Sequence, residues 1–181
     1  MPAGLLKEAS VLIPALLVAG IAAVCDWRSR RIPNWLTVSS VFIGFGISAG
    51  SSGWLGAKMS LQGIGLALGV LLPFVLLKGL GAGDWKLMGA VGAFLGPMLF
   101  LFVMVGSIFA SGIMAVIQMY RVGRVIETLR NMWTLVKGFA AFGIKKNPQI
   151  SLDNPRLLKL PFGVAVAAAT IVCCCAAYWP V

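Results

Sequence analysis

An uncharged stretch of 34 residues, 87–120, is the feature that most restricts how this chain can fold. As one straight helix it would be about 50 Å long, whereas the hydrocarbon core of a bilayer is about 30 Å thick. Gly96-Pro97 is the natural break, because proline removes a backbone donor and clashes with the preceding turn. We therefore predict a short helix over residues 85–95 and a longer one over residues 98–120.

The composition points to the membrane class. Only 11% of the residues are charged and 60% are hydrophobic, whereas a soluble domain carries about 25% charged residues. The other segments long enough to span a bilayer are residues 9–25, 36–55, 61–80 and 160–178. We predict one all-α integral-membrane domain over residues 1–181. It would have about six transmembrane helices, of which the short fourth one is re-entrant or lines a cavity.

The basic residues are distributed unevenly along this layout. The net charge is +10, and 13 of the 15 Lys and Arg residues fall in the first, third and fifth predicted loops. Cytoplasmic loops of membrane proteins collect Lys and Arg, so we expect these loops in the cytoplasm and both termini outside. Membrane topology then accounts for the charge, and no nucleic-acid partner is expected.

The fifth predicted loop, residues 121–159, contains a basic amphipathic pattern. In "RVGRVIETLRNMWTLVKGFAAF" the apolar residues recur at helical spacing, with Arg, Lys and Glu on the other side. This pattern predicts a cytoplasmic interfacial helix that contacts lipid head groups. It would act as a passive anchor or would gate the entry of a substrate.

Two of the five acidic residues stand at predicted membrane boundaries. Asp26 ends the first span and Asp84 begins the fourth, so both face the same side. Ionisable residues at such positions indicate function. Two close carboxyls share a proton, so one can activate water while the other donates a proton to a peptide. Glu8, Glu127 and Asp153 fit better as solvated surface charges.

No metal or cofactor is predicted. The chain has no histidine, and its four cysteines form no CxxC pair, so a structural zinc site is not expected. The run Cys173, Cys174 and Cys175 lies in an apolar segment and fits the role of small apolar residues.

Residues next to the two aspartates are candidates for substrate binding or support. Gly81 and Gly83 can take positive φ and let a peptide approach Asp84, or they allow tight helix packing. The remaining candidates are basic or lie in the turn after the first span, and each also has a plain structural interpretation in membrane orientation or turn formation. Arg28, Arg30 and Arg31 can steer an acidic substrate segment, Lys86 can tune Asp84, and Asn34 shapes the turn.

Three segments resemble one known family. "CDWRSRRIPNWLT" and "GAGDWKLMGAVGAFLG" resemble the two signature segments of type IV prepilin peptidases, the GxGD class of membrane aspartic proteases. "LPFGVAVAAA" resembles the weaker third signature of that family. The resemblance implies that Asp26 and Asp84 are catalytic, that no cofactor is needed and that the enzyme lies in the bacterial inner membrane.

The chain departs from the long form of this family, because it has no N-terminal region with paired CxxC motifs. It is similar to the short form found in tight-adherence (Flp) pilus systems, so methyltransferase activity is not expected. The resulting hypothesis is an aspartic endopeptidase that removes the leader of membrane-inserted prepilins at the cytoplasmic face. The alternatives are a small proton- or cation-coupled transporter and a catalytically silent assembly factor.

Overall fold

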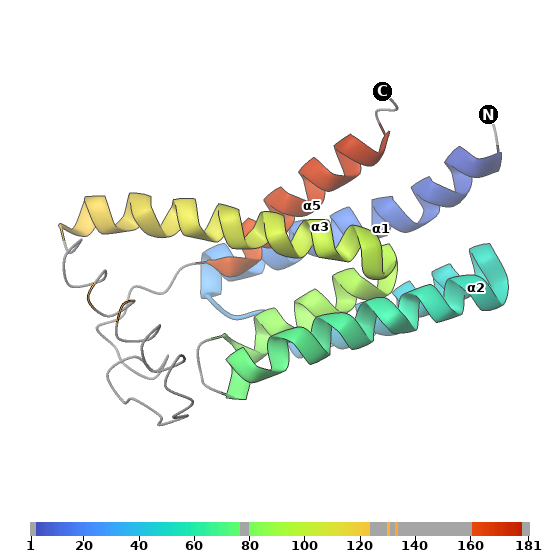
Figure 1. Ribbon diagram of the computed structural model, residues 1–181, viewed down its shortest axis with the longest axis horizontal. Coiled ribbons are helices and arrows are strands. Elements are labelled where there is room, and N and C mark those ends of the chain that lie inside the picture. Colours follow the sequence, from blue (N-terminus) through green and yellow to red (C-terminus); the bar gives the residue numbers. More distant parts are fainter. Residues whose placement is uncertain (1–2, 77–79, 124–129, 131–132, 134–160, 179–181) are drawn as a thin grey trace.

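The described part of the chain consists of helices. The computed structural model describes residues 3–76, 80–123, 130, 133 and 161–178, and these ranges contain no strand. The helices are α1 (Ala3–Ser29), α2 (Asn34–Leu76), α3 (Ala82–Val122) and α5 (Phe162–Tyr178) (Figure 1). The predicted all-α class is confirmed. The predicted interfacial helix within residues 121–159 lies almost wholly outside the described residues.

Two glycines reverse the direction of the long helices. Gly53 in α2 has φ 58° and ψ −139°, and Gly96 in α3 has φ 69° and ψ −179°. These values are accessible to glycine and strained for residues with a Cβ atom. Figure 1 shows that α2 and α3 each double back into two arms. The carbonyl of Ser48 accordingly contacts Gly56 across the reversal of α2.

The reversal in α3 is at the predicted Gly96-Pro97 break. In α2 the expected interruption between residues 55 and 61 is wrong, since the only non-helical backbone inside α2 is at Gly53. As a straight rod, the 43 residues of α2 would be about 65 Å long, twice a bilayer core. A single glycine thus replaces the loop that the hydropathy pattern suggested, and the number of membrane crossings stays a prediction.

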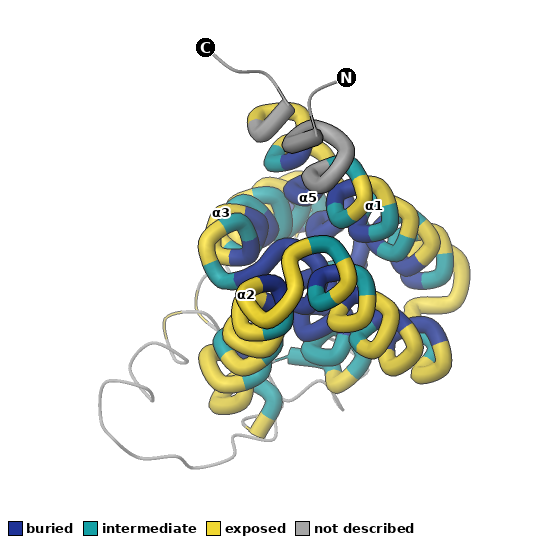
Figure 2. Tube along the Cα trace, turned by 90° about the vertical axis from the view of Figure 1, so that its right-hand side faces the viewer, coloured by how far each residue is buried: buried dark blue, intermediate teal, exposed yellow. Residues whose placement is uncertain are grey.

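The first arm of α3 is the centre of the molecule. Residues 87–96 are all buried, without a break (Figure 2). Both arms of α2 pack on this arm: the hydroxyl of Ser48 donates to the carbonyl of Ala93 at 3.3 Å, and Gly63 meets the backbone of Gly92. The short helix that we expected to be re-entrant or to line a cavity is therefore enclosed by protein, and its last residues, Phe94 and Leu95, line a cavity as one alternative had it.

A tryptophan fixes the start of this central arm. The indole N–H of Trp85 donates to the backbone carbonyl of Leu68 on the second arm of α2 at 2.9 Å. The Leu68 carbonyl belongs to the backbone of α2, so this hydrogen bond joins the Trp85 side chain to the helix itself. This bond fixes how far α3 is shifted along the axis of α2, and it therefore fixes the position of the first turn of α3.

The outer surface of the bundle is apolar. Large side chains such as Leu17, Phe42 and Phe109 are more than half exposed. Three helices are long and apolar enough to cross a membrane, and α5 is a shorter apolar helix. In water such a surface would be unstable, but lipid tails can cover it. The chain is thus a membrane protein with a protein-filled centre.

Candidate active site

Asp26 lies near the end of α1 with only 6% of its surface exposed. Its Oδ2 accepts a hydrogen bond of 2.7 Å from the backbone N–H of Gly163, in the first turn of α5. A buried carboxylate without a partner is costly, and the first N–H groups of a helix have no partner within that helix. The bond therefore satisfies both groups and fixes the direction of the Asp26 carboxyl.

Gly163 has no room for a side chain. A Cβ atom there would lie 3.0 Å from the Cβ of Asp26, 3.1 Å from its Oδ2 and 3.4 Å from the carbonyl oxygen of Ala22. Pro161 directly precedes α5, and its carbonyl accepts the N–H of Val164 at 3.2 Å. Residues 161–163 thus start α5 where it contacts Asp26 and Ala22 of α1.

A tight turn ends α1 beside the same carboxyl. The N–H of Arg30 donates to the backbone carbonyl of Asp26 at 2.9 Å, and Arg30 takes a left-handed φ of 50°. The hydroxyl of Ser29 donates to the carbonyl of Cys25 at 2.7 Å. A left-handed residue after the last turn is a common helix ending, although it favours glycine. Because of this turn, the charge of Arg30 acts on the Asp26 carboxyl.

Asp84 occupies the first turn of α3, two residues inside the helix. Its carboxyl folds back over Gly81, where a Cβ atom would lie 2.9 Å from Oδ2 of Asp84. Gly81 has φ −68° and ψ 140°, and Gly83 is helical, so the positive φ considered for these glycines is not observed. What "GAGD" supplies is space for the carboxyl of Asp84.

Gly83 lies where two segments approach each other closely. A Cβ atom on Gly83 would touch Ile32 of the α1–α2 connection at 3.4 Å from its Cβ and 3.7 Å from its carbonyl oxygen. The start of α3 therefore lies directly on the loop that follows Asp26. A Cβ atom at this position would make only an ordinary contact, so the packing seen here does not require glycine.

The two aspartates are brought to one end of the bundle. The end of α1, the start of α3 and the start of α5 all lie there (Figure 1). Asp84 is partly exposed, and its carboxyl is close enough to Asp26 for a negative charge on Asp26 to disfavour ionisation of Asp84. Two carboxyls that are 58 positions apart in the sequence thus share one end of the bundle.

The other predicted residues surround this pair in different ways. Lys86 donates from Nζ to Oδ1 of Asn34 at 2.9 Å, and this bond links the start of α3 to the start of α2. Arg28 is exposed in the last turn of α1, and Arg31 is exposed on the connection that follows. Lys86 is thus bound to Asn34, and the charge that acts on Asp84 is that of Asp26.

Sequence reasoning did not predict three contacts of the site. The N–H of Gly163 positions Asp26, the charge of Arg30 reaches the Asp26 carboxyl, and Ile32 contacts the start of α3. Arg30 was expected only to steer a substrate, and Gly163 stood in the segment that resembles the third family signature, without a role of its own. No spacing rule indicates that this turn meets a residue 137 positions earlier.

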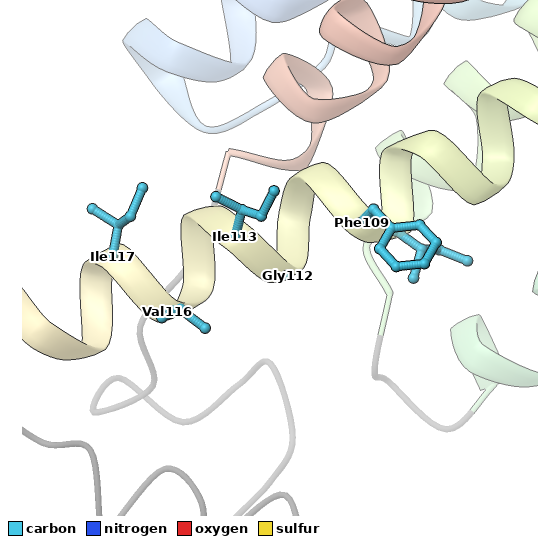
Figure 3. Close-up of a pocket in the computed structure, with 6 residues that line it drawn as sticks. Phe109, Gly112, Ile113, Val116 and Ile117 are labelled. Carbon is cyan, nitrogen blue, oxygen red and sulfur yellow. The ribbon is translucent and has the colours of Figure 1, made fainter.

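The aspartates belong neither to a group of metal-ligating side chains among the described residues nor to the apolar hollow on α3. Among the described residues no three His, Cys, Asp or Glu side chains are grouped to hold a metal ion. An apolar hollow lies along one face of the second arm of α3, and Figure 3 shows its side chains. Its lining consists of Ile108, Phe109, Gly112, Ile113, Val116 and Ile117.

Comparison with protein families decides the assignment. The model of the type IV leader peptidase family matches residues 11–116, more than half of the chain, and this range includes both aspartates. The chain belongs to the type IV leader peptidase family. Membership in this peptidase family makes the chain a protease, in agreement with the resemblance seen in its segments. Comparisons with curated proteins and with solved structures gave no significant match.

Proposed function

We propose that this protein is an aspartic endopeptidase that removes the leader peptide of type IV or Flp-type prepilins. The observation that carries the proposal is that Asp26 and Asp84, which come from helices remote in the chain, lie at the same end of the bundle, where the start of α3 packs on the connection that follows Asp26. Each carboxyl lies against a glycine: the N–H of Gly163 donates to Asp26, and Gly81 leaves the space that the Asp84 carboxyl occupies. The type IV leader peptidase family supplies the substrate class.

The chemistry needs one proton shared by two carboxyls. In the ground state one carboxyl is ionised and accepts a hydrogen bond from water, while the other is protonated and faces the scissile carbonyl oxygen. As the water attacks, the first carboxyl takes a proton from it and the second gives its proton to the carbonyl oxygen, which yields a tetrahedral diol. Collapse of the diol breaks the C–N bond: the proton taken from water passes to the leaving amine, and one diol hydroxyl returns a proton to the second carboxyl. The N–H of Gly163 occupies one oxygen of Asp26, which leaves the other oxygen for the water.

The side of cleavage follows from charge. Because 13 of the 15 Lys and Arg residues lie in loops on the same side as the two aspartates, we place the site at the cytoplasmic face of the inner membrane. The apolar helix of the prepilin would lie in the bilayer against the apolar surface of the bundle. Arg28 and Arg31, exposed next to the site, would meet acidic groups of the substrate.

Conservative replacements of the aspartates test the proposal. Asp26→Asn keeps an oxygen that can accept from the N–H of Gly163, so the fold should survive while the acid–base function is lost. The same applies to Asp84→Asn, and Asp153→Asn is the matched control. Each variant is reconstituted with a tight-adherence prepilin, and leader removal is followed by gel shift and mass spectrometry. General acid–base groups contribute about 10²–10⁴-fold, so we expect both site variants to lose at least about a hundredfold in rate.

Full processing by either site variant would overturn the assignment. Uncleaved prepilin with the wild-type protein would favour the assembly-factor alternative. Proton or cation flux in proteoliposomes, abolished by the same two replacements and without cleavage, would favour the transporter.

A further inference from the structure

The side chain of Lys86 joins the two segments that carry the aspartates. Its Nζ donates to Oδ1 of Asn34 at 2.9 Å. Lys86 is two residues after Asp84, and Asn34 is eight residues after Asp26. Along the chain the two aspartates are 58 positions apart, with both arms of α2 between them. The bond from Lys86 to Asn34 is therefore a direct link between segments that the chain itself connects only through a long detour.

Lys86 points away from Asp84. Each residue of a helix is turned by about 100° from the one before it, so residues two apart face nearly opposite sides. A lysine ammonium can only donate hydrogen bonds, so the amide oxygen of Asn34 is the group that faces it. The side chain of Lys86 is thus used to reach α2.

A second contact ties the same segments together. A Cβ atom on Gly83 would lie 3.4 Å from the Cβ of Ile32, on the connection between α1 and α2. Gly83 and Lys86 are three positions apart, so they lie on one face of α3. That face therefore meets the connection and the start of α2 at two points, one on each side of Asp84 in the sequence.

Both partners of the bond stand in helix starts that other contacts hold. The hydroxyl of Thr37 donates to the backbone carbonyl of Asn34 at 3.2 Å, and Thr37 is only 1% exposed. On the other side, Lys86 lies between Trp85, whose indole is bonded to α2, and the fully buried Leu87. A hydrogen bond between two anchored points restricts their relative position more than one between loose segments.

We propose that Lys86 is a positioning residue: its bond to Asn34 holds the start of α3, and with it the Asp84 carboxyl, against the segment that follows Asp26. This role rests on the proposed peptidase function. It depends on the reach and the donor group of the side chain, whereas the sequence alone suggested that the charge of Lys86 acts on Asp84. Without the bond the separation of the two carboxyls varies more, so the reaction slows while substrate binding is kept.

Asn34→Leu separates positioning from charge, because it removes the acceptor with a side chain of similar size and leaves every charge of the site in place. Asn34 is exposed, so this replacement should not impair folding. Lys86→Met removes the donor, and Lys86→Arg keeps both donor and charge. The matched controls are Gln62→Leu, an exposed amide elsewhere on α2, and Lys58→Met, an exposed lysine that lies over the ring of Trp54.

Leader removal from a purified tight-adherence prepilin is measured with the full-length protein over a range of substrate concentrations. We expect Asn34→Leu and Lys86→Met each to lower kcat about three- to tenfold, with KM nearly unchanged. The double variant should be no slower than either single one, because both replacements remove the same bond. Lys86→Arg and the two controls should cleave like wild type.

Hydrogen exchange followed by mass spectrometry gives a readout that does not depend on cleavage. Peptides that cover the start of α3 should exchange about three- to tenfold faster in Asn34→Leu and in Lys86→Met, because a contact that opposes local opening is gone. The two controls should exchange like wild type at this turn.

A wild-type kcat in Asn34→Leu would overturn the positioning role, and so would additive losses in the double variant. A slow Lys86→Met with a displaced pH profile, beside a fully active Asn34→Leu, would assign Lys86 a charge effect instead. If the wild-type protein cleaves no prepilin, the proposed peptidase function fails and the exchange result decides the link alone. Equal exchange in wild type and Asn34→Leu would then overturn the link, and faster exchange in the variant would support it.

Discussion

Replacing Gly163 by alanine should uncouple Asp26 from α5. The new Cβ atom would stand 3.0 Å from the Cβ of Asp26 and 3.1 Å from its Oδ2, below ordinary van der Waals separation. Backbone or carboxyl must then move by several tenths of an ångström, which lengthens the 2.7 Å bond between them. A hydrogen bond to a charged group is worth about 1.5–3 kcal/mol.

The expected loss follows from that energy. Each 1.36 kcal/mol corresponds to a factor of ten in rate, so complete loss of the bond would lower kcat/KM by about 10- to 150-fold. The decrease should appear in kcat, because Gly163 positions the reacting carboxyl and is not proposed to hold the substrate. Leader removal from a purified prepilin, measured over a range of substrate concentrations, gives both constants.

The control is Gly20→Ala on the same helix as Asp26, where a Cβ atom meets nothing within 4 Å. This variant should keep its activity and gain slight stability, since alanine is the better helix former. If Gly163→Ala cleaves within about twofold of wild type while remaining folded, the positioning role assigned to Gly163 is wrong.

Three further predictions test other contacts. Gly81→Ala should displace the Asp84 carboxyl, whose Oδ2 would lie 2.9 Å from the added Cβ, and lower the cleavage rate by about tenfold or more. Gly63→Ala would drive a methyl group into the backbone of Gly92, so purified protein should show a markedly lower thermal midpoint or fail to fold. Trp85→Phe removes one 2.9 Å hydrogen bond and should cost about 1 kcal/mol, a fall of roughly 2–4 °C in the thermal midpoint.

Two alanine variants serve as comparisons for these. Gly65→Ala lies on the same arm of α2 as Gly63 but faces open space, so its thermal midpoint should match or exceed that of wild type. Gly83→Ala brings its Cβ to 3.4 Å from Ile32, an ordinary contact, so it should lose less activity than Gly81→Ala. A larger loss of activity in Gly83→Ala than in Gly81→Ala would contradict the role of Gly81 as space for the Asp84 carboxyl.

Unchanged stability of Trp85→Phe would mean that the hydrogen bond from Trp85 to Leu68 does not stabilise the packing of α3 on α2.

Local chemistry made part of this site predictable. The two acids stood out because carboxylates are costly beside apolar runs. Gly96-Pro97 marked a break because an unbroken helix through residues 87–120 would be longer than the bilayer core is thick. In α2 the predicted spans 36–55 and 61–80 left a loop between them, but the helix resumes directly after Gly53. The left-handed backbone conformation of Gly53 determines where α2 reverses, and average hydropathy carries no information on backbone conformation.

The contacts that position the site were beyond sequence reasoning. The bond from Gly163 to Asp26 joins residues whose separation follows no helical or strand period. Lys86 is only two residues from Asp84, which suggested a charge effect, yet its Nζ reaches Asn34 across the helix interface. Packing between helices set both outcomes, and one sequence contains no direct measure of such packing.

The dependence of Asp26 on α5 has a consequence for biosynthesis. Ribosomes make α1 and α3 before α5, so a nascent chain already contains both acids while the N–H that orients one of them does not yet exist. Proteolytic competence would then arrive with the final helix, and an incompletely inserted molecule would remain harmless to neighbouring membrane proteins.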